Sequence, residues 1–170
     1  MVNVNKTTLG CLLFKPDIFI DNRCSFVESY NKKIYDFMIK EHLGKHLEFV
    51  QDDFSLGKKN VLKGIHGDRN TWKLISCPYG ELYLAVVNPQ TKNWESFPLN
   101  HKNSHQVLIP AGFGNGHLIL SDKAVFHYKQ TRYYDNPQQF TIKWNDSDYN
   151  ILWPIDNPIL SKRDSTSNKR

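Results

Sequence analysis

Short apolar or alternating runs, separated by turn-forming residues, fill most of the sequence beyond residue 46. Leu47–Val50, Glu81–Val87, Gln106–Ile109 and Ala124–Tyr128 are examples, and Gly, Pro, Asn and Asp lie in the intervals between such runs. Many short strands with regular turn signals are typical of β-sandwiches and jelly rolls. No strand–helix–strand alternation appears, so we expect an all-β fold rather than an α/β fold.

One helix is predicted close to the N-terminus, over residues 31–43. Ile34, Phe37 and Met38 fall near helical spacing, and Gly44 provides a stop. The length of 170 residues suits one domain with a sizeable core. We therefore expect a single domain over residues 1–170 with a short N-terminal helix, and a polar tail that frays over residues 165–170.

Composition narrows the classes of protein that fit this chain. Hydrophobic residues make up 39% of the sequence, which indicates a globular chain, and no apolar run is long enough to span a membrane. The N-terminus lacks the pattern of a secretory signal, and three cysteines without paired spacing do not indicate disulfides, so we expect a cytoplasmic protein. The net charge of +5 is not arranged as a basic stripe with stacking aromatics, which argues against nucleic-acid binding.

His66 ends an apolar strand and is a candidate for chemistry. An imidazole titrates near neutral pH and can serve as a general base, although a lone strand histidine is more often a hydrogen-bonded core residue. Metal binding would need further ligands, yet His66 is followed by Gly67 and Asp68, and His101 and His105 lie in a polar loop. The sequence therefore predicts no metal site.

Tyr128 and Lys73 lie within apolar strands. A strand alternates its faces, so Tyr128 and Phe126 point one way while His127 and Lys129 point the other. Tyrosine is a weak acid that can deliver a proton, and a lysine that points into a barrel needs an anionic partner. Taken singly, Tyr128 and Lys73 also fit ordinary roles at the rim of a core or on the surface.

Considered together, these segments resemble the dTDP-4-dehydrorhamnose 3,5-epimerase family. The strings that carry the resemblance keep the family's order and spacing from about Phe19 to Asp164. They are Phe49-Val-Gln-Asp-Asp-Phe-Ser55, Val61-Leu-Lys-Gly-Ile-His66, Trp72-Lys-Leu74, Ile109-Pro-Ala-Gly-Phe-Gly-Asn-Gly-His117, Tyr128-Lys-Gln-Thr-Arg-Tyr-Tyr134, Ile142-Lys-Trp-Asn-Asp146, Trp153-Pro-Ile155 and Ile159-Leu-Ser-Lys-Arg-Asp164. Each string is weak alone, whereas the ordered set is specific. The resemblance implies a cupin-like jelly-roll β-sandwich, a homodimer with exchanged N-terminal strands, and no cofactor.

The resemblance also implies roles for individual residues. His66 would be the base, paired with Asp164, while Lys73 would stabilise an enolate. Tyr128 would supply a proton from the opposite face. The residues that would hold the nucleotide, its phosphates and the sugar are Arg23, Phe26, Glu28, Gln51, Lys63, Asn115 and His117. Such groups suit a sugar with a C4 ketone, because the ketone acidifies the hydrogens on C3 and C5.

Several positions depart from the family's pattern. Lys63 replaces an arginine, and Asn115 replaces a histidine, with His117 two residues on. A Gly-Asp pair ending at Asp68 replaces Tyr-Gln, and Asp53 replaces an asparagine. Most of these changes are expected in the phosphate and sugar region. We therefore predict a side branch that prefers GDP slightly over dTDP and resembles epimerases of GDP-linked 4-keto-6-deoxy-heptoses in capsule or lipopolysaccharide biosynthesis.

The predicted reaction is inversion at C3 and then at C5 of the nucleotide sugar. A C3-only epimerase with the same residues stays open as an alternative. A 3,4-ketoisomerase is another, although it would not be expected to keep Tyr128. A non-catalytic sugar-binding jelly roll would be expected to have lost His66, Lys73, Tyr128 or Asp164, and all of them are present.

Overall fold

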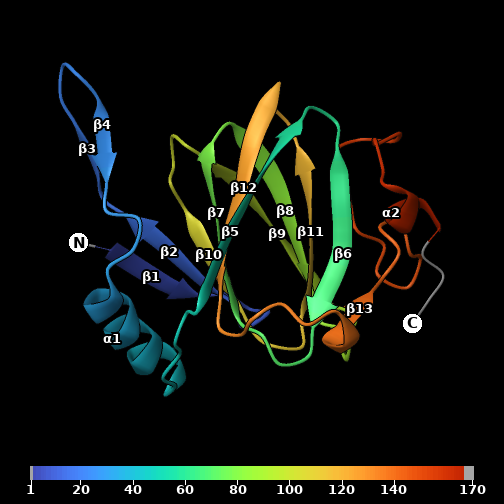
Figure 1. The fold of residues 1–170 in the computed structure, drawn as a ribbon, viewed down its shortest axis with the longest axis horizontal. Coiled ribbons are helices and arrows are strands. Elements are labelled where there is room, and N and C mark those ends of the chain that lie inside the picture. The colour runs from blue at the N-terminus through green and yellow to red at the C-terminus, as the bar shows by residue number, and fades with distance from the viewer. Residues whose placement is uncertain (1, 167–170) are drawn as a thin grey trace.

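The computed structural model describes residues 2–166. Two antiparallel sheets face each other, and a separate hairpin projects from one side (Figure 1). The larger sheet contains, in spatial order, β1 (Val2–Lys6), β2 (Leu12–Pro16), β10 (Gln106–Ile109), β7 (Lys73–Tyr79), β12 (Lys123–Gln130) and β5 (Gln51–Lys58). The smaller sheet contains, in spatial order, β13 (Gln139–Thr141), β6 (Leu62–Asp68), β11 (Gly114–Ile119), β8 (Glu81–Val87) and β9 (Trp94–Asn100).

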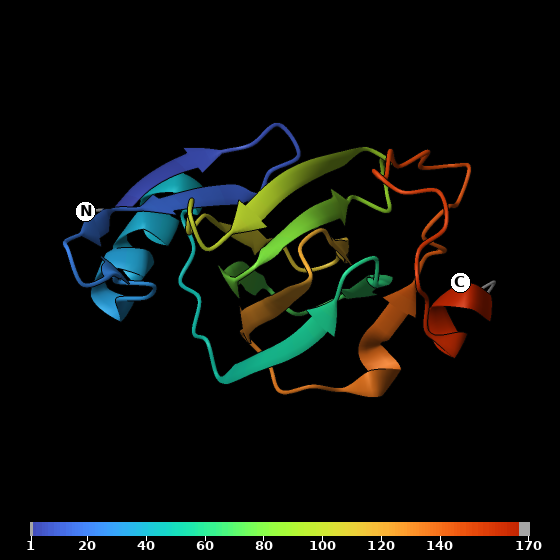
Figure 2. The ribbon, with the colours of Figure 1, turned by 90° about the horizontal axis from the view of Figure 1, so that it is seen from above.

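This arrangement is a cupin-like jelly-roll sandwich, which confirms the expected fold class. Strands that are distant in sequence are neighbours in each sheet: β12 lies between β7 and β5, and β11 lies between β6 and β8. Figure 2 shows the layers of strands from above, with the N-terminal strands and helix at one end and the last helix at the other. The topology therefore brings together strands from distant parts of the sequence: β5, β7 and β12 in the larger sheet, and β6 and β11 in the smaller one.

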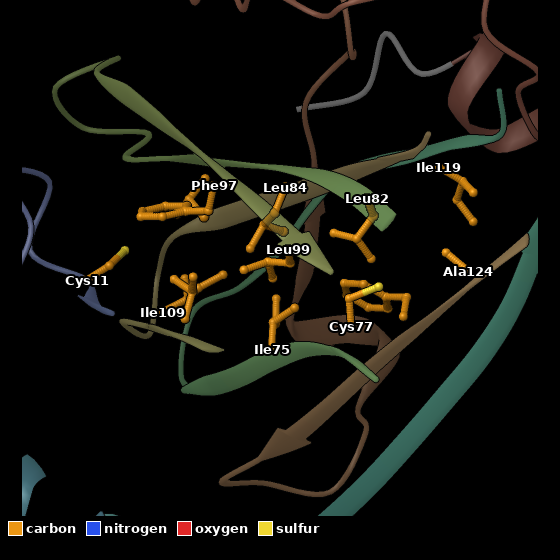
Figure 3. Packing of buried hydrophobic residues seen from close by; sticks show 13 residues of the cluster. Cys11, Ile75, Cys77, Leu82, Leu84, Phe97, Leu99, Ile109, Ile119 and Ala124 are labelled. Carbon is orange, nitrogen blue, oxygen red and sulfur yellow. The ribbon is translucent and has the colours of Figure 1, made fainter. Parts of the chain in front are cut away.

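The main core lies between the two sheets. Figure 3 shows Leu82, Leu84 and Leu99 from the smaller sheet facing Ile75 and Ile109 from the larger one, and all of them are at most 2% exposed. Burying an aliphatic side chain of this size stabilises a fold by about 1.5–3 kcal/mol. This apolar core fills one part of the sandwich, and several polar side chains lie in another part of the interior.

The helix α1 (Lys32–Leu43) confirms the predicted N-terminal helix. The side chain of Asn31 caps its first turn by accepting a backbone hydrogen bond, and Gly44 ends it with a left-handed φ of 64°. Tyr35 and Ile39 are buried and pack against the N-terminal strands and β10. The helix therefore covers one end of the larger sheet, away from the polar interior (Figure 1).

The strand predicted over residues 47–50 is not formed in the structure. Residues 47–50 form no strand, and β5 begins directly after them at Gln51. Leu47 and Phe49 are half-buried and pack against the apolar cluster beside α1. The alternation of apolar and polar residues over 47–50 suggested a strand. In the structure the apolar side chains are instead buried against that cluster.

Two further segments of the described chain lie outside the sandwich. The hairpin of β3 (Ile18–Ile20) and β4 (Ser25–Val27) stands clear of both sheets (Figure 1), and Phe19, Ile20 and Phe26 on it are exposed. After a short 3-10 helix (Asn136–Gln138) and β13, the chain ends in α2 (Lys162–Thr166) beside β6. The first two residues of the tail predicted to fray therefore belong to α2, and residues 167–170 lie outside the described part. None of the helices within residues 2–166 combines the length and apolar character that crossing a membrane requires.

Candidate active site

A cavity of about 420 Å³ lies between the two sheets. Strands β5, β7 and β12 of the larger sheet line one side, and β6, β11 and β13 of the smaller sheet line the other, with α2 at the edge. The lining side chains are those of Asp53, Phe54, Ser55, Lys63, His66, Lys73, Asn115, His117, Phe126, Tyr128, Tyr134, Gln139 and Arg163. The cavity thus gathers six of the residues singled out in the sequence, namely Lys63, His66, Lys73, Asn115, His117 and Tyr128.

His66 on β6 pairs with Asp164 on α2. Its Nε2 lies 2.7 Å from Oδ1 of Asp164, and Ser161 Oγ donates to Oδ2 at 2.8 Å. Burial by itself raises the pKa of Asp164, but hydrogen bonds from His66, Ser161 and the backbone of Gly64 outweigh it, so the pKa lies below its ordinary value. Because a carboxylate only accepts hydrogen bonds, Nε2 of His66 must carry the proton, and Nδ1 is left as the basic nitrogen of the neutral ring.

The depressed pKa of Asp164 predicts a pH-dependent contribution to stability. A carboxyl whose folded pKa lies below the unfolded value near 3.8 stabilises the fold above that pH, and the contribution disappears as the pH falls through the folded pKa. Asp164→Asn should therefore flatten the fall in the free energy of unfolding below about pH 4. Urea denaturation at a series of pH values checks this, with the exposed Asp122→Asn as control, and unchanged acid sensitivity in Asp164→Asn would contradict it.

Tyr128 and Lys73 occupy the larger-sheet side of the cavity. Tyr128 shares the inner face of β12 with Phe126, as predicted, and Lys73 Nζ lies 5.8 Å from the centroid of the Tyr128 ring. Burial, followed by the hydrogen-bonded carboxylate of Asp53, raises the pKa of Tyr128 to about 12. Burial lowers the pKa of Lys73, and the charge of Asp68 opposes that shift. The phenol is therefore held protonated, and the lysine carries a poorly solvated charge suited to an anionic partner.

Strand pairing places Asn115, His117 and Lys63 in the same cavity. In the β6–β11 ladder Asn115 lies opposite His66, and His117 lies opposite Lys63. Gly64 has a φ of 112°, and a Cβ there would meet the carbonyl oxygen of Asn115 at 2.7 Å. A glycine is therefore required for β6 to approach β11 this closely, and the approach sets the positions of Lys63 and His66 on either side of it.

The remaining predicted binding residues do not line the cavity. Gln51 sits beside it and donates a hydrogen bond of 2.8 Å to Asp53, which does line it. Arg23, Phe26 and Glu28 belong to the projecting hairpin region and are exposed. Arg23 forms an ion pair within its own loop. Within one chain, then, Arg23, Phe26 and Glu28 do not line the cavity that holds the proposed proton-transfer groups.

Several lining residues were missed in the sequence. Ser55 follows Gln51 by four positions on the same face of β5, so strand alternation was a usable signal for it. Arg163 directly precedes Asp164, and a search for cations beside that carboxylate would have found it. Tyr134 reaches the cavity from the loop before β13, and Gln139 reaches it from β13 itself. No local sequence pattern predicts that these two residues line a cavity.

The chemistry available in this cavity is acid–base chemistry. Within residues 2–166 no group of three or more His, Cys, Asp or Glu side chains is arranged to hold a metal ion. The cavity combines a histidine–carboxylate pair, a protonated phenol and a buried lysine. Together, fold and site define the class as a jelly-roll enzyme whose cavity carries side chains capable of acid–base chemistry.

Comparison with known proteins specifies this class further. Residues 6–169 match the family model described as dTDP-4-dehydrorhamnose 3,5-epimerase. The enzyme of that name from Shigella flexneri is 37% identical, over 99% of this chain and 96% of its own length. The crystal structure of a dTDP-6-deoxy-D-glucose-3,5-epimerase from Legionella pneumophila, in complex with dTDP-4-keto-L-rhamnose, has a TM-score of 0.87 and 33% identity, over 97% of this chain and 90% of that one.

The chain belongs to the dTDP-4-dehydrorhamnose 3,5-epimerase family and is an isomerase of the epimerase class. This confirms the resemblance found in the sequence. A second solved relative, the dTDP-4-dehydrorhamnose 3,5-epimerase from Bacillus anthracis with TDP and pyrophosphate bound, has a TM-score of 0.88 and 33% identity, over 98% of both chains. A more distant relative from Streptomyces niveus, 27% identical over 88% of this chain and 74% of its own length, is a dTDP-4-dehydrorhamnose 3-epimerase.

Proposed function

We propose that this enzyme is a 3,5-epimerase of a nucleoside-diphosphate 4-keto-6-deoxy sugar. The observation that carries the proposal is that His66, paired with Asp164, lines one cavity together with Tyr128 and Lys73. The relatives named above act, by their names, on sugars of this kind. The reaction consists of proton transfers alone, so the proposal requires no cofactor and no metal.

His66 is the base in this proposal. Its Nε2–H is held by Asp164, and its Nδ1 hydrogen-bonds to no residue among those the structure describes, which leaves a lone pair for the proton on C3 or C5. Loss of that proton moves an electron pair into the C4 carbonyl and forms an enolate. The Asp164 carboxylate stabilises the imidazolium that results, as in other histidine–carboxylate pairs. A well-placed base of this kind contributes roughly 10²- to 10⁴-fold to the rate.

Lys73 and Tyr128 complete the reaction in the proposal. The buried ammonium of Lys73 faces the developing oxyanion on C4, and a fixed donor at such a place contributes on the order of 3 kcal/mol. Tyr128 then delivers its proton to the carbanion on the face opposite His66, because the two residues project from opposite sheets. Exchange with solvent returns the proton on His66 and restores the phenol of Tyr128.

The choice between C3 alone and both carbons is tested by isotope labelling. We expect the reaction in D₂O to place deuterium first at C3 and then at C5, with inverted configuration at both. The product is reduced and its label located by NMR. Label at C3 alone would make the enzyme a 3-epimerase, and a ketone moved to C3 would support the 3,4-ketoisomerase alternative. No label in any nucleoside-diphosphate 4-keto-6-deoxy sugar would refute the proposed function.

The nucleotide is a finer part of the proposal. Of the departures that suggested GDP, Lys63 and Asn115 line the cavity, whereas Asp68 lies outside it beside a separate surface pocket. The relatives named above are called after dTDP sugars, which favours dTDP. The preference for a GDP-linked heptose stays a prediction. Calorimetry with GDP and dTDP decides between them, and clearly tighter binding of dTDP would refute that preference.

We further propose a homodimer in which the β3–β4 hairpin of one protomer completes the cavity of its partner. Phe26 on this hairpin is 63% exposed. Phe54 and Leu56 on β5, an edge strand of the larger sheet, are 75% and 59% exposed, and Phe54 also lines the cavity. Exposed apolar side chains on the hairpin and on β5 favour burial of both places in an interface. In the proposal Phe26 stacks on the base of the nucleotide, while Arg23 and Glu28 contact its polar groups.

Complementation between two variants tests the shared site. His66→Asn removes the proposed base, and Phe26→Ala removes the proposed stacking residue. If each site combines His66 from one protomer with Phe26 from the other, one of the two sites in a mixed dimer is intact. Random exchange of equal amounts should therefore restore about one quarter of wild-type activity. A mixture no more active than the average of the two variants, or a fully active monomer by light scattering, would contradict the proposal.

A further inference from the structure

His117 is a buried polar residue whose hydrogen bonding is incomplete. It projects from β11, is 4% exposed, and its ring stacks on Phe126 with centroids 3.9 Å apart and an interplanar angle of 9°. Its Nε2 is buried and has no hydrogen-bond partner among residues 2–166, although the residue lines the cavity. Unpaired buried polar atoms are costly, and few are kept in a folded protein unless a ligand uses them.

The charge state of His117 limits which chemical group of a ligand can bind to it. Burial, with Lys63 and His66 nearby, lowers the pKa of His117 to about 3, so the ring is neutral under ordinary conditions. A neutral imidazole has one donor and one acceptor nitrogen. Phosphate oxygens would be better served by the charged Lys63 and Arg163, which also line the cavity. A hydroxyl suits the neutral ring, because it can accept a hydrogen bond from the N–H or donate one to the other ring nitrogen.

The position of His117 indicates which hydroxyl it meets. A 4-keto-6-deoxyhexose linked through C1 has free hydroxyls on C2 and C3 only, and C3 is a reacting carbon. A 6-deoxyheptose adds one hydroxyl on C7, which lies beyond C5 on the side of the ring away from the phosphate. His117 lies opposite Lys63 in the strand ladder, while the neighbouring Asn115 lies opposite His66. Along the strand, His117 therefore lies farther from the proposed base, His66, and nearer to Lys63, whose charge is available for a phosphate. Between the reacting C3 and the phosphate on C1 lies C2.

We propose that the imidazole of His117 hydrogen-bonds to the C2 hydroxyl of the sugar and so sets the enzyme's specificity for a 2-hydroxy substrate. This inference rests on the proposed function and deepens it by naming a recognised group. Stacking on Phe126 fixes the plane of the ring, and its neutrality keeps it out of the proton transfers of His66. His117 is thus a binding residue that orients the sugar ring between its phosphate and its reacting carbons.

The test compares His117→Phe with the wild type on a nucleotide sugar and on its 2-deoxy analogue. Phenylalanine keeps the stacking on Phe126 and removes both ring nitrogens. We expect the wild type to prefer the 2-hydroxy substrate by about 10-fold in kcat/KM, and His117→Phe to lose that preference, mainly through KM. His105→Phe, which changes a half-buried histidine outside the cavity, is the matched control and should keep the wild-type preference.

Stability supplies an independent readout. Because His117→Phe removes an unpaired buried nitrogen, its Tm should equal or exceed that of the wild type. A variant that retains the full preference for the 2-hydroxy sugar overturns the inference, and so does one that slows both substrates equally. If the wild type turns over neither substrate, the proposed function itself fails, and that outcome is distinct from a wild type that is active but indifferent to the C2 hydroxyl.

Discussion

Replacement of His66 by asparagine is expected to lower solvent proton exchange into the substrate by roughly 10³-fold. The substitution removes the basic nitrogen of the His66–Asp164 pair but keeps an amide that can still donate to the buried carboxylate of Asp164. Loss of a base affects the chemical step and leaves ground-state binding nearly unchanged. The rate of deuterium incorporation, read by mass spectrometry, measures the first effect, and calorimetry with the nucleoside diphosphate measures the second.

A matched control separates loss of the base from a general effect of removing a histidine. His101→Asn alters a histidine that stacks on Tyr79 outside the cavity, and it should leave exchange unchanged. If His66→Asn kept even a tenth of the wild-type rate, another residue would have to be the base. If nucleotide binding were lost together with exchange, His66 would have a structural role in holding β6 against α2, and the assignment as base would be unsupported.

Local sequence patterns predicted the fold well, because short apolar runs are separated by turn residues and some strands, such as β5, alternate between their two faces. The outward and inward faces of β12 follow the alternation of Phe126, His127 and Tyr128, and α1 is bounded by a capping residue and a glycine. The pattern failed where apolar residues serve a different purpose. Leu47 and Phe49 bury against the cluster beside α1, and such side chains resemble those of a strand in a window of four residues.

The site was less predictable, since its parts come from segments far apart in the chain. His66 and Asp164 are separated by 98 positions and meet only because α2 packs against β6. The family resemblance supplied this pair, whereas hydrophobic periodicity carries no information about it. The Tyr128–Asp53 contact likewise depends on the register of β12 against β5, which places these two residues directly opposite each other.

Replacement of Tyr128 by phenylalanine is expected to separate proton exchange from inversion. His66 can still remove a proton from its own face and return one from solvent, so deuterium should enter C3 within about 10-fold of the wild-type rate. Without the phenol of Tyr128 the carbanion loses the acid proposed to protonate it on the face opposite His66, so formation of the inverted product should fall by at least about 100-fold. Mass spectrometry of recovered substrate follows the exchange, and NMR of the reduced product follows the configuration.

The raised pKa of Tyr128 explains why exchange without inversion is a demanding test of its role. A phenol with its pKa raised by burial and by Asp53 stays protonated at neutral pH, so it can donate, but it does so only to a strongly basic carbanion. Tyr133→Phe, which changes an exposed tyrosine nearby in sequence, is the control and should leave both rates unchanged. Inversion at the wild-type rate in Tyr128→Phe would require a different donor. Equal loss of exchange and inversion would place Tyr128 in enolate formation beside Lys73, and the opposite-face mechanism would then be wrong.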